Sequence, residues 1–243
     1  MALAALQTAL RLVYPPRCIL CGTLVDSDFG LCGPCWRDTP FAAGLVCDTC
    51  GTPLPGEDDD EKVICDDCLV TARPWSMGRA ALLYRDNARR LVLALKHGDR
   101  QDVVRPATLW LARAAQPMLT DDMLIAPVPL HWTRMLRRRF NQSALLGRAL
   151  ARHLDLPDCP DLLRRTARTP PLDGMGVETR FTTLAGVIRV NPARAGKMQG
   201  RTVLLVDDVM TSGATLAASA LACLDGGARD VRVLALARVV RDA

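Results

Sequence analysis

The chain has few aromatic side chains, which make up 4% of its 243 residues, and it has no long apolar run. Proteins that bind single-stranded nucleic acid stack its bases on aromatic platforms, so this composition argues against that mode of binding. A membrane-spanning helix needs about 18 consecutive apolar residues, and no run approaches that length. Residues 1–10 are apolar but have no basic segment before them, which favours a short amphipathic helix over a secretory signal. We therefore expect a cytoplasmic protein with no membrane span.

Charge is unevenly distributed along the chain, although the net charge is only +5. Residues 1–75 carry 5 Lys and Arg against 11 Asp and Glu, whereas residues 76–243 carry 26 against 15. We therefore expect two unequal domains, an acidic one over 1–75 and a basic one over 76–243 that handles a polyanionic ligand. Charge alone does not distinguish nucleic acid from a pyrophosphate.

Eight of the ten cysteines form four C-x2-C pairs. Two thiolates separated by two residues fit one tetrahedral metal ion, and two such knuckles complete a shell of four thiolates. We predict two structural zinc ions, because four thiolates leave no open coordination position for catalysis. The simplest assignment groups the knuckles sequentially, and a crossed grouping of the first knuckle with the third is the alternative. The predicted ligands are Cys18, Cys21, Cys32, Cys35, Cys47, Cys50, Cys65 and Cys68.

Disulfides and an iron–sulfur cluster are the competing interpretations of these cysteines. Without a secretion signal, repeated C-x2-C pairs argue against disulfides. Evenly spaced double knuckles within about fifty residues are more typical of a double zinc ribbon than of an iron–sulfur cluster. A segment this poor in apolar residues is expected to need its metal in order to fold.

From residue 78 onward, strand and helix patterns alternate, which predicts an α/β fold with a parallel sheet covered by helices. Right-handed crossovers would place the strand ends, and therefore a ligand, along one edge of the sheet. The expected strands are 80–84, 124–130, 185–190, 203–206 and 231–237, and the expected helices include 87–96, 106–116 and 141–154.

The most informative segment is an apolar strand, 203–206, followed by Asp207 and Asp208, a small hydroxylated turn and a helical pattern. Such a turn places backbone N–H groups and hydroxyls at a helix N-terminus, where a phosphate is favoured. The two carboxylates can accept hydrogen bonds from sugar hydroxyls. The segment therefore predicts a site for a ligand with a ribose and a 5′-phosphate. The predicted site residues are Asp207, Asp208, Val209, Met210, Thr211, Ser212, Gly213, Ala214 and Thr215.

An ordinary strand–turn–helix connection, with Thr211 or Ser212 as the N-cap, is the competing interpretation. It explains the small residues but leaves Asp207 and Asp208 without a role. The segment also closely resembles the motif with which type I phosphoribosyltransferases bind phosphoribosyl pyrophosphate (PRPP).

Two further segments of the large domain carry groups suited to a polyanion. Four arginines lie between residues 134 and 139, just before F-N-Q-S at 140–143. Arg134 and Arg138 are candidates to bind a pyrophosphate bidentately, and a solvated basic face or a nucleic-acid patch is the alternative. Segment 164–183 is polar and rich in Pro and Gly, which predicts a long loop that acts as a lid.

The order of these motifs is similar to that in the ComF family of competence-associated proteins, over nearly the whole chain. Zinc knuckles come first, followed by L-K-H-G at 95–98, P-V-P-L-H at 127–131, F-N-Q-S at 140–143 and D-D-V-M-T-S-G-A-T at 207–215. The resemblance implies a double zinc ribbon fused to a type I phosphoribosyltransferase-like domain that binds PRPP with Mg²⁺.

Carried onto this chain, the resemblance gives each segment a role. It implies that Asp207 and Asp208 bind the ribose hydroxyls and that 211–215 binds the 5′-phosphate. The pyrophosphate loop would be 127–131, which includes Pro129, and segment 164–183 would be the flexible hood.

The chain departs from the family pattern at three positions. Arg139 stands where the family usually has the glycine of R-G-F-N-Q. Leu172 stands at an expected glutamine of the hood, and Thr183 at an asparagine expected three residues after Arg180. If these residues orient a nucleophile, the departures affect turnover more than PRPP binding.

Two functions from different classes follow. The first is a PRPP-binding phosphoribosyltransferase, a glycosyltransferase that transfers phosphoribosyl to an unidentified acceptor, releases pyrophosphate and is linked to DNA uptake. The second is a non-catalytic PRPP-sensing or DNA-binding module whose partners would be single-stranded DNA or the competence machinery. A former transferase domain that serves as an interaction scaffold is a third interpretation.

Overall fold

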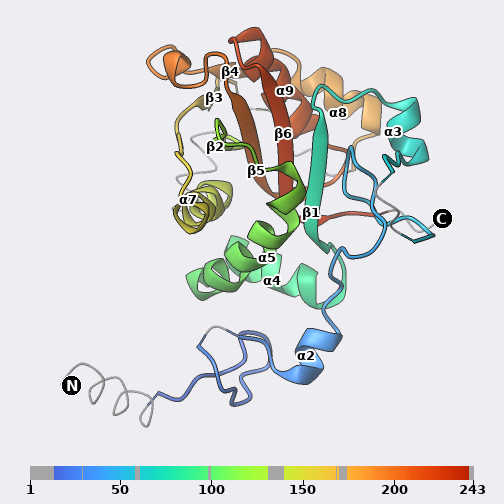
Figure 1. Ribbon diagram of the computed structural model, residues 1–243, viewed down its shortest axis with the longest axis vertical. Helices are drawn as coiled ribbons and strands as arrows, with labels where there is room; N and C mark the ends of the chain where they lie inside the picture. The colour runs from blue at the N-terminus through green and yellow to red at the C-terminus, as the bar shows by residue number, and fades with distance from the viewer. Residues whose placement is uncertain are drawn as a thin grey trace.

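The computed structural model has at its centre a four-stranded sheet in the order β1-β6-β5-β2 (Figure 1). All neighbouring strands are parallel, which confirms the predicted parallel α/β sheet. The strands are β1 (Met77–Leu83), β2 (Leu124–Pro127), β5 (Thr202–Met210) and β6 (Asp230–Arg238). The structure describes residues 14–28, 30–57, 61–97, 100–130, 140–167, 169 and 174–240.

Strand β5 is buried on both faces of the sheet. Successive side chains of a strand point to opposite sides, and on β5 both sides are covered. Val203 and Leu205 belong to one buried cluster, whereas Leu204 and Val206 belong to the other. All four side chains have no exposed surface. A strand covered on both sides is a continuous apolar run, which explains why this segment is recognisable in the sequence.

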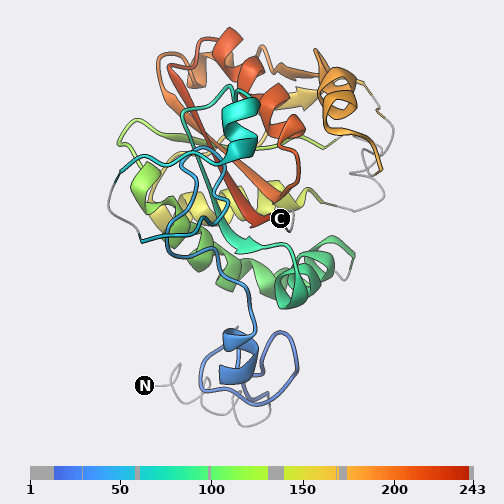
Figure 2. The same ribbon diagram turned by 90° about the vertical axis from the view of Figure 1, so that its right-hand side faces the viewer.

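Helices cover both faces of the sheet (Figures 1 and 2). Helices α4, α5 and α7 pack on the side of Leu204, and α8 and α9 contribute to the cluster on the side of Leu205. The helices expected over 87–96, 106–116 and 141–154 are confirmed to within two residues. Their bounds are α4 (Asp86–His97), α5 (Val104–Ala115), α7 (Gln142–Leu154), α8 (Val177–Leu184) and α9 (Ala214–Asp225), and single 3₁₀ turns cover Gln101–Val103, Gln116–Met118 and Ala195–Lys197.

The expected strand 185–190 does not join the main sheet, so this part of the prediction was wrong. Strand β4 (Ile188–Val190) pairs antiparallel with β3 (Leu163–Arg165) in a separate two-stranded sheet. Ile188 is buried and Arg189 is exposed. A strand with one wet face is typical of antiparallel pairing rather than of a parallel sheet covered on both sides.

Strand β5 is longer than expected and contains the two carboxylates. Pairing with β6 continues through Asp207 and Val209 to Met210. Pairing with β2 stops at Val206, which lies opposite Pro127, because proline cannot donate to the ladder. Asp207 and Asp208 therefore lie beside a strand that has already ended, and this leaves room for groups from neighbouring helices.

The first zinc ribbon, residues 14–37 with helix α2 (Gly33–Arg37), lies at one end of the molecule (Figures 1 and 2). It touches the large domain through a small cluster in which Ile19 packs on Leu91 and Val103. Arg100 Nη2 donates to the carbonyl of Ile19 at 3.0 Å. This ribbon therefore packs against the helices of the large domain and not against its sheet.

The second zinc ribbon, residues 45–70 with helix α3 (Asp66–Val70), packs directly on the edge strand β1. Its four ligand cysteines are members of the same buried cluster as Leu205. The amide of Gly78 donates to Asp48 O at 2.8 Å, and Arg79 forms an ion pair with Asp48 at 2.5 Å. The ribbon is thus packed against the edge of the sheet, across the division that the sequence suggests after residue 75.

The contact between Gly78 and the second ribbon has no space for a side chain. A Cβ atom at this position would meet the carbonyl oxygen of Thr49 and would lie 2.9 Å from Val233 Cγ2. We expect Gly78→Ala to lower the free energy of unfolding by about 1–3 kcal/mol, the usual cost of overpacking. Gly196→Ala is the matched control, because its Cβ would meet nothing within 4 Å. Urea unfolding of both variants tests this, and equal stabilities would contradict the tight docking.

Candidate functional site

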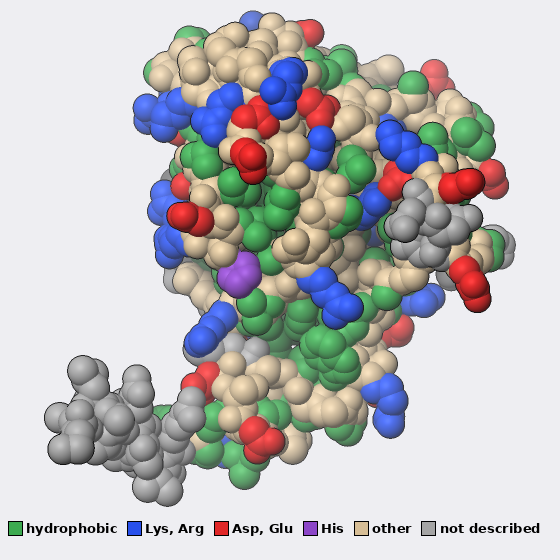
Figure 3. Space-filling view, viewed as in Figure 1, with side chains coloured by type: hydrophobic (Ala, Val, Ile, Leu, Met, Phe, Trp, Pro, Cys, Tyr) green, Lys and Arg blue, Asp and Glu red, His purple; other side chains and the backbone are tan. Residues whose placement is uncertain are grey.

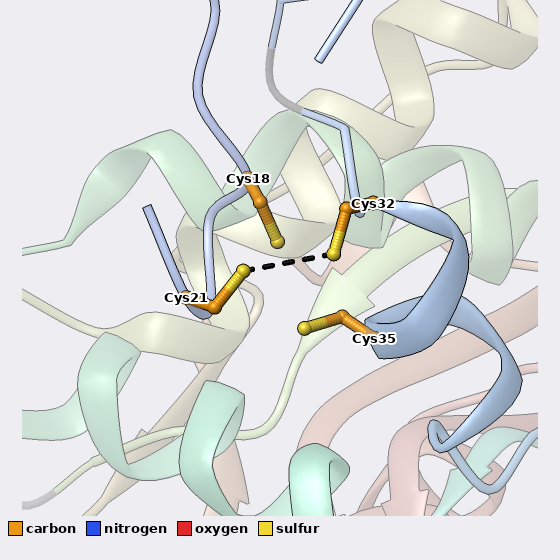
Figure 4. Close-up of side chains that lie close together, drawn as sticks. All are labelled: Cys18, Cys21, Cys32 and Cys35. Atoms are coloured by element: carbon orange, nitrogen blue, oxygen red, sulfur yellow. Dashed lines mark hydrogen bonds between the residues drawn. The ribbon is translucent and has the colours of Figure 1, made fainter. Parts of the chain in front are cut away.

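The ligand cysteines form two separate groups of four thiols. Within each group all Sγ atoms lie within 4.8 Å of one another, and the first group converges on one point (Figure 4). One pair in each group is 3.6 Å apart. Thiolates about 2.3 Å from a tetrahedral zinc ion lie roughly 3.8 Å apart, so both groups fit structural zinc. The grouping is sequential: Cys18, Cys21, Cys32 and Cys35, then Cys47, Cys50, Cys65 and Cys68.

The first and third knuckles repeat one local structure with the sequence C-x2-C-G-T. Gly22 and Gly51 follow the second cysteine with φ of +78° and +71°, a region that only glycine adopts readily. The hydroxyls of Thr23 and Thr52 lie 3.3 and 3.1 Å from that cysteine's Sγ atom. They are placed to donate a hydrogen bond to a thiolate. The recurring threonine is visible in the sequence but was not identified from it.

The acidic pair is held by groups from two helices. Asp207 Oδ1 accepts hydrogen bonds from Ser143 Oγ and from the amide of Asp208, each at 2.9 Å. Asp208 Oδ2 lies 3.4 Å from Lys96 Nζ, and both of these side chains are less than one-fifth exposed. The two carboxylates therefore have different partners, a hydroxyl from the start of α7 and an ammonium group from the end of α4.

Asp207 lies in surroundings that disfavour its charged form. Burial, together with repulsion from Asp208, raises the pKa of Asp207 to about 7, although the hydrogen bond from Ser143 and the charge of Lys96 oppose the shift. Strongly perturbed carboxylates are concentrated at functional sites. The site thus holds a carboxyl group whose charge changes near neutral pH.

The turn after β5 begins helix α9 at a glycine. Gly213 is the N-cap, with φ of +79°, and makes no side-chain cap. The N-cap of this connection is therefore Gly213 and not Thr211 or Ser212. The Ser212 hydroxyl instead accepts from the amide of Ala214 at 3.4 Å. A Cβ atom on Gly213 would lie 3.1 Å from Arg73 Nη1, so only glycine fits without strain.

Three arginines surround the turn. Arg73 Nη1 donates to Ser212 O at 2.6 Å, and Arg180 Nη1 donates to Thr211 Oγ1 at 3.3 Å. Arg238, at the end of β6, donates to the carbonyl of Thr211. Between them lies a pocket of about 380 Å³, walled by the segment after the second ribbon, helix α8 and the turn.

The structure describes only part of the predicted pyrophosphate-binding region. Pro129 is buried just after β2, and the Asn141 side chain donates to the neighbouring carbonyl of Val128 at 3.0 Å. The same side chain caps α7 by accepting from the amide of Ser143. Arg134, Arg138, Arg139 and Leu172 lie outside the described residues.

The hydrogen bonding of two residues, Gln142 and Thr183, could not be expected from the sequence. Gln142 is 1% exposed, yet neither atom of its side-chain amide has a hydrogen-bond partner in the described structure. Thr183, one of the departures from the family pattern, turns its hydroxyl back to the carbonyl of Thr179 at 2.6 Å.

Four residues at the site were missed as functional residues by reasoning from the sequence. Lys96 and Ser143 stand within the quoted motifs L-K-H-G and F-N-Q-S, so a signal was present. Arg73 and Arg238 stand in no recognisable motif. Both reach the turn from distant parts of the chain, and only the fold reveals them.

The fold and the cysteine groups define a class of protein: a double zinc ribbon joined to a parallel α/β domain. The family model for the double zinc ribbon domain matches residues 9–69. The DNA utilization protein YhgH of Shigella flexneri is 30% identical over 236 residues, which cover 94% of this chain and all of that protein. The competence protein F of Haemophilus influenzae is 28% identical, over 91% of this chain and 96% of that protein. The chain belongs to the ComF family.

Solved structures give a weaker likeness, confined to part of the chain. The adenine phosphoribosyltransferase of Thermoanaerobacter pseudethanolicus is 17% identical over 58% of this chain and 82% of that chain, with a TM-score of 0.36. The phosphoribosylpyrophosphate synthetase of Mycobacterium smegmatis is 18% identical over 57% of this chain and 34% of that chain, with a TM-score of 0.33. Among the described helices, none is long and apolar enough to cross a membrane.

The raised pKa of Asp207 predicts a pH-dependent stability. Between about pH 4 and pH 7 the unfolded chain has lost this proton and the folded chain retains it, so rising pH lowers the free energy of unfolding. Asp207→Asn keeps one oxygen that accepts from Ser143 but carries no charge. We expect it to raise the free energy of unfolding at pH 8 by on the order of 1–3 kcal/mol, since one pKa unit corresponds to about 1.4 kcal/mol. The gain should shrink as the pH approaches 4.

Urea unfolding across this pH range measures the effect. Asp225→Asn is the control, because Asp225 is exposed at the end of α9 and should change stability by less than about 0.5 kcal/mol. A destabilised Asp207→Asn at pH 8 would mean that the ionised carboxylate is well paired in the folded protein.

Proposed function

We propose that the large domain binds PRPP together with Mg²⁺ at the carboxyl end of β5. The observation that supports this most strongly is the position of two carboxylates near the end of β5, just before the turn that leads into the N-terminus of α9. Asp207 and Asp208 each have a second carboxylate oxygen, besides those held by Ser143 and Lys96, that could accept from a diol, and the helix N-terminus beyond Gly213 favours a phosphate. A ribose 5-phosphate carries both groups within one molecule.

Each segment of the site has a role in this proposal. Asp207 and Asp208 accept hydrogen bonds from the ribose hydroxyls, and the turn 211–215 holds the 5′-phosphate. The 127–131 loop, which includes Pro129, would lie beside the pyrophosphate, with Arg134 and Arg138 supplying charge. Mg²⁺, held mainly by ligand oxygens and water, would neutralise charge on the pyrophosphate.

The reaction that fits this ligand is phosphoribosyl transfer. The bond between C1 of the ribose and the pyrophosphate oxygen breaks, pyrophosphate leaves, and a nitrogen base or amine bonds to C1 and loses a proton. Positive charge from arginines favours the departing pyrophosphate. Arg180 reaches the turn from α8 at 3.3 Å and so connects the predicted hood, 164–183, with the phosphate site.

The biological setting that we propose is DNA uptake or utilization, because the relatives are named for competence and DNA utilization. We place the protein in the cytoplasm. None of the ten cysteines forms a disulfide, and a reducing compartment keeps thiols available for zinc.

Calorimetric titration of the zinc-loaded protein with PRPP and Mg²⁺ tests the proposal. We expect micromolar binding by the wild type and affinity at least about 100-fold lower for Asp207→Asn/Asp208→Asn, because hydrogen bonds to charged groups are the stronger ones. Asp225→Asn should bind like the wild type. No binding by folded, zinc-loaded wild type would refute a PRPP site.

Single-stranded DNA binding is the second candidate, and one structural observation favours it. The chain has ten aromatic side chains, and three of them cluster between the first ribbon and α5. The ring centroids of Trp36 and Phe41 are 4.5 Å apart, and those of Phe41 and Trp110 are 5.6 Å apart. They line a groove of about 760 Å³ whose wall carries Lys62 and Arg113 together with Asp48 and Glu61. Figure 3 shows hydrophobic side chains gathered between the first ribbon and the sheet domain. The low overall aromatic content therefore does not exclude stacking at one place.

Quenching of tryptophan fluorescence by an unlabelled oligothymidine tests this candidate. If the groove stacks bases, affinity should fall as salt rises, and Trp36→Ala should weaken binding by about tenfold or more. Leu221→Ala, an exposed apolar change on α9, is the control. DNA affinity that is unaffected by Trp36→Ala would exclude this groove.

A further inference from the structure

We propose that the second zinc ribbon orients the phosphate turn 211–213 through Arg73 and Arg238, so that its metal site controls ligand binding at that turn. This inference rests on the proposed function for its ligand. It makes Arg73 and Arg238 positioning residues rather than ligand contacts.

The first step concerns the carbonyl groups of the turn. Arg73 Nη1 donates to Ser212 O at 2.6 Å. Arg238 Nη1 donates to Met210 O at 3.3 Å and also to Thr211 O. Three successive carbonyls are therefore held by two guanidinium groups.

The second step concerns the N–H groups that follow. None of the described peptide bonds is cis, and in a trans peptide the C=O of one residue and the N–H of the next point in opposite directions. Carbonyls fixed at 210–212 therefore turn the amides of Thr211, Ser212 and Gly213 away from the two arginines. Within the described residues, these three amides meet no hydrogen-bond acceptor. Successive free N–H groups of this kind form an anion-binding concavity.

The third step connects Arg73 and the turn to the ribbon by packing. Trp75 Nε1 donates at 2.6 Å to the carbonyl of Thr49, which lies inside the third cysteine knuckle. The Arg73 guanidinium lies 5.6 Å from the centroid of the Trp75 ring. A Cβ atom on Gly213 would touch Trp75 Cη2 at 3.2 Å. The knuckle, Trp75 and the turn are thus in continuous contact.

The fourth step connects the arginines to the ribbon by charge. Arg238 lines one cavity together with Thr52 and Cys65 of the ribbon, and Arg73 follows Cys68 by five residues along the chain. Four thiolates around one Zn²⁺ carry a net charge of about −2, which two guanidinium groups balance. Neither arginine forms an ion pair with a carboxylate in the part of the chain that the structure describes. Loss of the metal site would remove this counter-charge from beside both arginines.

The first ribbon provides matched controls, because no hydrogen bond or ion pair of the described residues joins it to the turn. Arg100 is the equivalent arginine, since its Nη2 donates to the carbonyl of Ile19 in that ribbon at 3.0 Å. Arg73→Met and Arg100→Met each remove one guanidinium that bridges a ribbon and the large domain. Cys68→Ser and Cys21→Ser each remove one ligand, from the second and the first metal site.

The experiment combines two measurements on the full chain with its zinc content determined. Amide hydrogen exchange of 211–215 without ligand reports the order of the turn, and titration with PRPP and Mg²⁺ reports binding. We expect Arg73→Met to exchange faster at the turn and to bind PRPP about tenfold more weakly or worse, the loss expected for one charge-assisted hydrogen bond. Arg100→Met and Cys21→Ser should match the wild type in both measurements.

The outcomes separate this inference from the proposed function. If the wild type binds PRPP and Arg73→Met shows the same affinity and exchange, the inference is overturned. If the wild type does not bind PRPP, the proposed function fails, and faster exchange in Arg73→Met than in Arg100→Met still supports the orientation of the turn. If Cys68→Ser does not fold, the inference is decided by the exchange and affinity of Arg73→Met, which retains every cysteine.

Discussion

The end of strand β5 is the constraint on which the rest of the site depends. This strand is buried on both faces up to Val206 and continues beside β6 after β2 has stopped. A polar residue at this strand end is in contact with groups from the neighbouring helices and segments. Ser143 approaches from α7, Lys96 from α4, and Arg73 from the segment after the second ribbon. The carboxylates and the turn are therefore positioned by the whole fold rather than by local sequence.

Two adjacent carboxylates at a buried strand end destabilise the folded state, and the structure offsets this only in part. Lys96 lies next to Asp208, whereas Asp207 relies on one hydroxyl and one amide. A ligand that donates two hydroxyls would supply the missing partners, because hydrogen bonds to the charged form favour that form. In the PRPP site that we propose, the ribose hydroxyls would fill this role.

The zinc ribbons and the acidic turn could be predicted from the sequence because their chemistry is local. Cysteine spacing determines four-thiolate groups, and the apolar run before Asp207 marks a strand covered on both faces. The roles of Arg73 and Arg238 could not be predicted, since their partners lie 139 and 27 residues away along the chain. The membership of β4 in a separate sheet was missed for a similar reason. A three-residue strand carries too little periodicity to reveal its partner.

The two ribbons repeat one knuckle sequence but differ in how the rest of the chain uses them. Cys21 in the first ribbon is exposed, whereas Cys47 and Cys50 in the second have no exposed surface. Metal exchange at the first site needs no opening of the core. Exchange at the second site requires the ribbon to separate from β1, Trp75 and the cluster that contains Leu205. Local opening of this kind costs a large part of the global stability, so the second metal site and the turn beside it should open together.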